Sequence, residues 1–293
     1  MKTARRFFRN PASVLGLALV LMFVFVAVAA PLLAPPRPNQ RDPYQIPKDG
    51  FAMEPKPPSK AHPFGTTEGQ YDIYYGVVWG TRTAFQVGLI ITACTVVMGL
   101  TIGSIAAFYG GWVDEGLMRA TEIFMAFPFL LAALTMAAVL QSRLGRGITT
   151  GMIALIVFGW TTYARLIRGD ILSVKQRDYV LSARAVGAGD FRILTRHIIP
   201  NAIYPMMVTA SMDIGSYVLA FAALSFLGLG AEVGYADWGQ LISFARNWIP
   251  SLSRHWYIVV FPGVAIVLFV LGWNLMGDAL RDILDPRLRG TRG

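Results

Sequence analysis

The chain has 293 residues, of which 55% are hydrophobic and 15% charged, with a net charge of +9 and a mean hydropathy of +0.51. A soluble domain carries roughly 25% charged residues, so this composition excludes an ordinary water-facing surface and indicates a lipid environment. The basic balance does not predict nucleic-acid binding, because cytoplasmic loops of membrane proteins are themselves rich in Lys and Arg.

Six apolar runs along the chain are long enough to cross a bilayer, which requires roughly 20 apolar helical residues. In chain order the expected spans cover residues 14–33, 83–113, 123–142, 147–164, 198–230 and 256–277. Cleaved secretory signals have apolar regions of about 7–15 residues, so the longer first run predicts a retained helix. The sequence therefore predicts an all-α integral membrane protein with about six transmembrane helices.

The distribution of basic residues predicts which ends of the spans face the cytoplasm. If the amino terminus lies inside, 16 of the 26 Lys and Arg fall in segments on the inner side. An excess of basic residues marks the cytoplasmic side, so both termini are expected there.

The same reading divides the chain into four segments. Residues 1–34 form a cytoplasmic N-terminus and the first helix, and residues 35–82 a Pro-rich extracytoplasmic strap. Residues 83–284 form the transmembrane core, with an inner loop at about 165–200, and residues 285–293 a cytoplasmic tail. The three histidines are far apart without the spacing of metal ligands, so no metal site is expected.

The inner loop carries a run of small residues between basic ones. Ser182, Ala183, Ala185 and the glycines that follow leave a low surface that another protein can approach closely. Arg184, Arg192 and Arg196 offer donors for carboxylates on such a partner. Alternatively, the loop is only a solvated basic segment.

This loop resembles the conserved cytoplasmic loop of importer permeases of the ATP-binding-cassette (ABC) class. The pattern in that class is Glu-Ala-Ala, three residues, Gly, nine residues and a segment that closes in Leu-Pro. Here Leu181-Ser182-Ala183 stands in the first position, Gly187 is the glycine and Ile199-Pro200 closes the segment. Leu181 departs from the pattern, which leaves one contact of that class in doubt.

Further stretches resemble one branch of the class, the dipeptide, oligopeptide and nickel importer permeases. They are His62–Thr66, Leu224–Gly230, Phe261–Gly263 and, at the end of the last span, Asn274–Pro286. The similarity covers essentially the whole chain and implies a type I ABC importer permease fold.

The resemblance also implies a role and a set of partners. The chain is expected to be the non-catalytic permease subunit of a binding-protein-dependent importer for di- or oligopeptides, in the cytoplasmic (inner) membrane of a bacterium or archaeon. Its partners would be a second permease subunit, two ATPase subunits that use ATP and Mg, and an extracytoplasmic solute-binding protein. No lysine follows a glycine, so the chain has no phosphate-binding loop of its own. The residues expected to contact the ATPase are Leu181, Ser182, Ala183, Arg184, Ala185, Gly187, Ala188, Asp190 and Arg196.

Asp213 lies midway along the fifth apolar run. A charged residue at the bilayer centre costs about 2.5–3.5 kcal/mol, so this acid is expected to face protein or a water-filled path. We hypothesise that Asp213, with Ser216 and Ser225, lines the solute path and meets a cationic amine. Alternatively, Asp213 pairs with a basic group or lies near the outer surface.

Other functions fit parts of the pattern. A self-contained secondary transporter or channel would call for matching intramembrane acids in two halves, and Asp213 has no such counterpart. The same importer role for nickel chelates or oligosaccharides stays open, because the permeases of this branch resemble one another. Trp238, Trp248 and Trp256 are expected in an outer interfacial belt.

Overall fold

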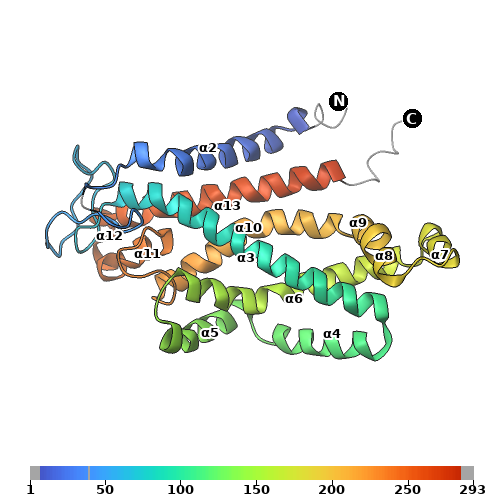
Figure 1. Cartoon of the computed structure of the whole chain (residues 1–293). Coiled ribbons are helices and arrows are strands. Elements are labelled where there is room, and N and C mark those ends of the chain that lie inside the picture. The colour runs from blue at the N-terminus through green and yellow to red at the C-terminus, as the bar shows by residue number, and fades with distance from the viewer. Residues whose placement is uncertain (1–6, 39, 285–293) are drawn as a thin grey trace.

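The structure is a computed structural model that describes residues 7–38 and 40–284. Five helices are long and apolar enough to cross a membrane, and they lie lengthwise in one bundle (Figure 1). They are α2 (Pro11–Leu33), α3 (Ile73–Tyr109), α6 (Ile148–Val174), α10 (Tyr204–Phe226) and α13 (Tyr257–Leu284). The bent pair α4 (Gly111–Met125) and α5 (Phe129–Leu144) is together long and apolar enough to count as a sixth, broken span. The expected all-α membrane fold is thus confirmed.

The span predicted over residues 123–142 is not one continuous helix, because α4 ends and α5 begins within it. Its two parts are bent by 84° at a short break before Pro128. Proline has no backbone N–H and disfavours helical geometry in the residue before it, so the helix ends before Phe127 and restarts at Phe129. The break is therefore caused by Pro128, which lies within an apolar run that otherwise predicts a continuous helix.

Helix α3 begins ten residues before the predicted start at residue 83, so the strap ends at Asp72 rather than at residue 82. The prediction stopped at the charge of Arg82, but Arg82 Nε donates to the carbonyl of Ala27 across 2.6 Å. Pro31 leaves that carbonyl of α2 without a helical donor, and Arg82 supplies one. An arginine inside the span is thereby accommodated.

Helix α6 also runs beyond its predicted end at residue 164, and it continues to Val174. Arg165 and Arg168 therefore lie on a helix and not in the inner loop. Arg168 forms a two-armed ion pair with Asp114 on α4, with 2.6 Å from Nε to Oδ1 and 2.6 Å from Nη2 to Oδ2. This pair joins the two helices near one end of the bundle.

Helices α3 and α6 pack closely through glycines. A Cβ atom on Gly99 would lie 2.3 Å from the Cβ of Tyr163, and one on Gly103 would lie 2.3 Å from the carbonyl oxygen of Ala164. Small residues let helix backbones approach where the hydrophobic effect does not drive association. The face of α6 that holds Tyr163 is consequently fixed against α3.

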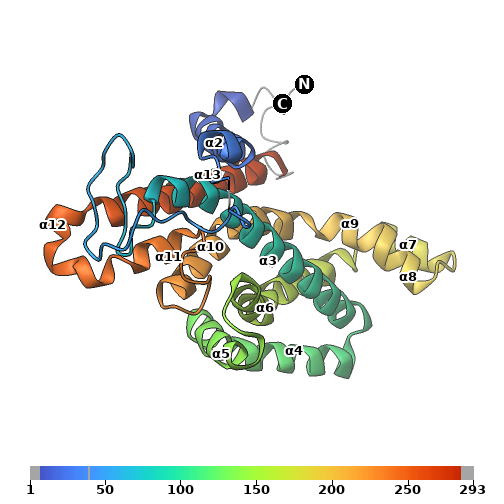
Figure 2. The same cartoon turned by 60° about the vertical axis from the view of Figure 1, so that its left-hand side comes forward.

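The Pro-rich strap lies at one end of the bundle, together with α11 (Trp238–Ser243), η2 (Arg246–Ser251) and α12 (Leu252–His255) (Figures 1 and 2). His62 fastens it, because its ring nitrogens lie 2.9 Å from Asp49 and 2.6 Å from Asp72. Asp72 also caps α3 by accepting from the amide of Tyr75. Trp238 is buried here and donates to the carbonyl of Val77, so its predicted place in an exposed belt is wrong.

The other end of the bundle carries α7 (Asp178–Ala185), α8 (Asp190–Ile193), the π-helical turn η1 (Leu194–Ile198) and α9 (Ile199–Ala202) (Figure 1). Helix α2 begins at this end and α13 finishes there. The predicted cytoplasmic tail, 285–293, lies outside the described residues.

Candidate functional site: a pocket at the broken span and an exposed helical surface

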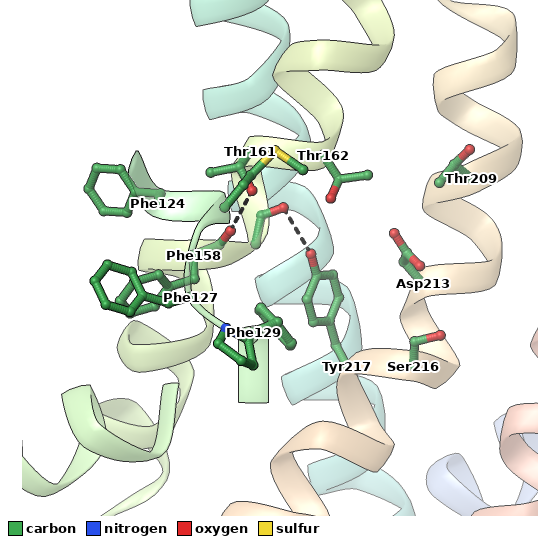
Figure 3. Close-up of a pocket in the computed structure, with 13 residues that line it drawn as sticks. Phe124, Phe127, Phe129, Phe158, Thr161, Thr162, Thr209, Asp213, Ser216 and Tyr217 are labelled. Atoms are coloured by element: carbon green, nitrogen blue, oxygen red, sulfur yellow. Dashed lines mark hydrogen bonds between the residues drawn. The ribbon is translucent and has the colours of Figure 1, made fainter. Parts of the chain in front are cut away.

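The break between α4 and α5 opens a pocket of about 520 Å³ toward α6 and α10. Phenylalanine rings from the break and from α6 form one side of it, and α10 forms the opposite side (Figure 3). The lining residues are Phe124, Met125, Phe127, Pro128, Phe129, Phe158, Gly159, Thr161, Thr162, Thr209, Asp213, Ser216 and Tyr217. The pocket is thus largely aromatic, with polar groups concentrated on one helix.

Those polar groups form a stripe along α10. Thr209, Asp213 and Ser216 are spaced by four and three residues, which places them on one helix face. Figure 3 shows all three on the same side of the pocket. Asp213 therefore stands between two hydroxyl groups, facing the aromatic side.

Asp213 is held by a hydrogen bond from another helix. The hydroxyl of Tyr163 on α6 donates to Asp213 Oδ2 across 2.6 Å, and the Tyr163 side chain is fully buried. In the described part of the chain no Lys or Arg forms an ion pair with Asp213. Tyr163 thus orients the carboxylate from the side away from the pocket, and the pocket that the carboxylate faces suits a positively charged group.

Asp213 and Ser216 are brought together in this pocket, but Ser225 is not. Ser225 is fully buried at the end of α10, where its Oγ accepts from the amide of Ala231 across 3.1 Å. Its contacts belong to the loop that follows α10.

The sequence analysis did not identify Tyr163 or the pocket-lining phenylalanines as site residues. Tyr163 precedes Asp213 by 50 residues and has an ordinary apolar context, so no local pattern joins the two. Pro128 was the one usable signal, since a proline inside an apolar run marks a place where a span can open.

The second candidate region is the α7–α8 surface, which comprises the exposed residues between 178 and 193. Gly187 ends α7 with a φ of +83°, a left-handed conformation that favours glycine. Its amide donates to the carbonyl of Arg184, and the amide of Ala188 donates to that of Ala183. These two bonds form a Schellman motif, which fixes the direction of the turn.

Buried side chains anchor this surface to the bundle. Val180, Ile193 and Ile198 are at most 1% exposed and pack with α6 residues such as Ile167 and Ile171. The same cluster reaches the end of α3 and the first half of α10. A force applied to the α7–α8 surface would therefore reach three spans directly.

The α7–α8 surface also presents apolar side chains that sequence reasoning did not single out. Val186 and Phe191 are 84% and 81% exposed, and the predicted contact residue Leu181 is 51% exposed. Most of the other predicted contact residues are exposed, while Ala183 and Ala188 are half-buried. Exposed apolar groups among basic residues are typical of a protein-binding surface.

Comparisons with known proteins give the context of these two regions. Residues 99–290 match the family described as the binding-protein-dependent transport system inner membrane component, and residues 2–58 match the N-terminal TM domain of oligopeptide transport permease C.

Several curated bacterial proteins are similar over nearly the whole chain. A dipeptide transport system permease protein of Alkalihalophilus pseudofirmus is 34% identical, over 96% of this chain and 88% of that protein. A glutathione transport system permease protein of Pectobacterium atrosepticum is 36% identical, over 97% of this chain and 90% of that protein. An oligopeptide transport system permease protein of Bacillus subtilis is 34% identical, over 97% and 88%.

A solved structure supports the fold. A chain of the MetNI methionine ABC transporter, in an inward-facing conformation, superposes with a TM-score of 0.59 at 17% identity. The match covers 72% of this chain and 97% of that one. The helical core described above is thus similar in arrangement to that of an ABC importer subunit.

Proposed function

The chain belongs to the family of binding-protein-dependent transport system inner membrane components, and we propose that it is the permease subunit through which an ATP-driven importer takes up di- and oligopeptides. The proteins similar to this chain are named as permeases for dipeptides, oligopeptides and glutathione. Each of these solutes has a peptide-type backbone with charged ends. Such a subunit moves a solute and makes or breaks no covalent bond.

The observation that carries the proposal is the way in which the α7–α8 surface is attached. Its exposed side chains, Val186 and Phe191 among them, offer a contact area, while buried Val180 and Ile193 connect it to the spans. Separate ATPase subunits, using ATP and Mg, would bind this surface from the cytoplasm. ATP binding must favour one arrangement of the spans by several kcal/mol in order to shift the population strongly.

The pocket at the broken span supports the substrate class. Asp213 matches the ammonium of a peptide, and the phenylalanine side accepts apolar side chains. A carboxylate opposite aromatic rings would also accept sugar hydroxyls or a cationic nickel chelate, so these two stay the alternative substrate classes. The remaining partners would be a second permease subunit, which completes the solute path, and a solute-binding protein that docks at the strap end. The two permease subunits would lie in the inner membrane.

Copurification tests the proposed coupling. A Val186→Asp chain, expressed with its partner subunits, is expected to retain less ATPase than the unaltered chain, because a charge replaces an exposed apolar contact. Val233→Asp is the matched control, since Val233 is 54% exposed in the loop between α10 and α11, beside Gly234, which pairs with Ile46 of the strap.

Equal ATPase recovery with both variants would contradict the proposed docking surface. Peptide accumulation by this chain alone in vesicles, without an ATPase, would instead support a self-contained secondary transporter. The proposal would then be wrong.

A further inference from the structure

A second cavity, of about 390 Å³, lies at the strap end of the bundle and shares no lining residue with the pocket of Asp213. It is formed by the strap, α3, the turn between α5 and α6, and the loop after α10. Its polar lining comprises Asp42, Gln45, Gln86, Arg146, Glu232 and Tyr235, together with the threonines at the start of α6. This cavity thus combines two acids and one base.

The acidic wall is held in place by backbone pairing between two distant segments. The amide of Ile46 donates to the carbonyl of Gly234, and the amide of Ala236 donates to that of Tyr44, each across 2.7 Å. The rings of Tyr44 and Tyr235 stack with their centroids 5.4 Å apart. The strap and the loop after α10 therefore form one unit that carries Asp42 and Glu232.

The side chain of Asp42 is fixed within this unit. Its Oδ1 accepts from the amide of Tyr44 across 2.9 Å, which leaves Oδ2 for another donor. Burial, followed by the neighbouring Tyr44 and Asp42, raises the pKa of Tyr235, which lines the same cavity.

The basic wall comes from the turn between α5 and α6. Arg146 lies between two glycines, and a Cβ on Gly228 would be 3.3 Å from its Nη2. Glu232 approaches the same turn, because a Cβ on Gly147 would be 3.7 Å from its Oε1. Among the described residues, none of Asp42, Arg146 and Glu232 has an ion-pair partner within 4.0 Å.

We propose that this cavity binds the two charged ends of a short zwitterionic peptide, with Arg146 on the carboxylate and with Asp42 and Glu232 on the ammonium. The assignment rests on the proposed function and names a contact that precedes the Asp213 pocket along the path. A residue of extended chain spans at most about 3.6 Å, so a dipeptide places its two charges about 7 Å apart. The cavity falls within the range of about 300–1,000 Å³ that is typical of small-molecule sites.

The test measures peptide binding to the purified complex of this chain with its partner permease and ATPases, without the solute-binding protein. Asp213→Asn is present throughout, so that the inner pocket contributes little. Equilibrium dialysis compares three probes: alanylalanine, its C-terminal amide and N-acetylalanylalanine.

Each variant is expected to weaken the binding of only those probes that carry the charged group its side chain would contact. Arg146→Gln should weaken alanylalanine binding about ten-fold and leave the amide within two-fold, because the amide has no carboxylate to lose. Glu232→Gln should weaken alanylalanine and the amide, both of which keep the ammonium, and leave the N-acetyl form unchanged. Arg143→Gln, an exposed change on the last turn of α5, is the matched control and should alter none of them.

The outcomes separate this site from the proposed function. Equal weakening of all three probes, or the absence of alanylalanine binding by the Asp213→Asn complex, would overturn the cavity assignment. Raised ATPase activity in Arg146→Gln with unchanged probe preference would also overturn the cavity assignment. It would indicate that Arg146, Asp42 and Glu232 hold the resting conformation instead of binding a peptide. If instead probe binding depends on the ends as expected but the complete importer accumulates no peptide in vesicles, the site holds and the proposed function fails.

Discussion

The hydroxyl of Tyr163 donates a hydrogen bond of 2.6 Å to the carboxylate of Asp213, and so joins α6 to α10 behind the pocket. Tyr163 is fully buried, whereas Asp213 lines the pocket. The tyrosine therefore holds one oxygen of the acid and leaves the rest of the carboxylate to face the pocket. Because no Lys or Arg of the described chain forms an ion pair with this intramembrane acid, we propose that a solute supplies the positive charge.

Asp213→Asn is expected to slow the uptake of peptides with a free ammonium about 10- to 100-fold, because it removes a charge-assisted hydrogen bond worth about 1.5–3 kcal/mol. N-acetylated peptides should be slowed much less. The measurement is ATP-dependent uptake of both peptides into vesicles that contain the complete importer. Ser216→Ala, in the same pocket, is the control for a general effect of polarity. Equal slowing of both peptides by Asp213→Asn would remove the ammonium contact.

Five of the spans could be predicted because each contains a long apolar run, which few other structures accommodate, whereas the bent pair α4–α5 was foreseen only in its second half. Their boundaries could not, since the charges of Arg82 and Arg168 are accommodated by a carbonyl and by a carboxylate from distant helices. Asp213 was found as an isolated charge in an apolar run. Tyr163 was not found, because its role exists only once α6 packs beside α10.

Trp238 shows a second limit of sequence reasoning. Tryptophan near the end of a span is often interfacial, which is the basis of the belt prediction. In the structure a hydrogen bond to Val77 satisfies its N–H, so the whole ring can be buried against Phe269. Composition could not distinguish the two outcomes, since both place a tryptophan near the strap end.

The turn after α7 allows a sharp comparison of two glycines. A Cβ on either Gly187 or Gly189 would meet nothing within 4 Å, but their φ values are +83° and −70°. Gly187→Ala should cost about 1–2 kcal/mol through backbone strain, whereas Gly189→Ala carries no such strain, because its φ is one that any residue adopts. We expect Gly187→Ala to lower ATPase recovery and peptide uptake, with Gly189→Ala as the matched control. Equal results for the two variants would show that the Schellman turn does not matter for coupling.

Asp237 predicts a pH dependence of stability at the strap end. It caps α11 by accepting from the amide of Gln240 across 2.8 Å, and burial raises its pKa from 3.8 to about 6. The folded chain therefore holds this proton more tightly than the unfolded chain. The resulting stability is fully present below about pH 4 and is lost as the pH rises to about 6 and above.

Asp237→Asn keeps an oxygen that can cap the helix but has no proton to lose. Its free energy of unfolding should change less between pH 4.5 and pH 7 than that of the unaltered chain, by roughly 2 kcal/mol. Asp49 is the control, because a hydrogen bond from Arg37 holds its pKa below the usual range and Asp49→Asn should not flatten the profile in this way. An unchanged profile in Asp237→Asn would show that another group is responsible.

Lys175 connects the α7–α8 end to α3, and its removal is expected to loosen that end. Its Nζ donates to the carbonyls of Ala107 and Phe108 across 3.2 and 2.6 Å, where the last turn of α3 has no helical donors left. Lys175→Met retains an apolar stem but leaves these carbonyls unpaired, at a cost of about 1–3 kcal/mol. The variant should unfold at a lower temperature and couple ATP hydrolysis to uptake less tightly, because α3 and α6 are no longer tied beside the α7–α8 surface. Arg177→Met, an exposed change two residues away, is the matched control, and equal unfolding temperatures for the two variants would contradict the role of this cap.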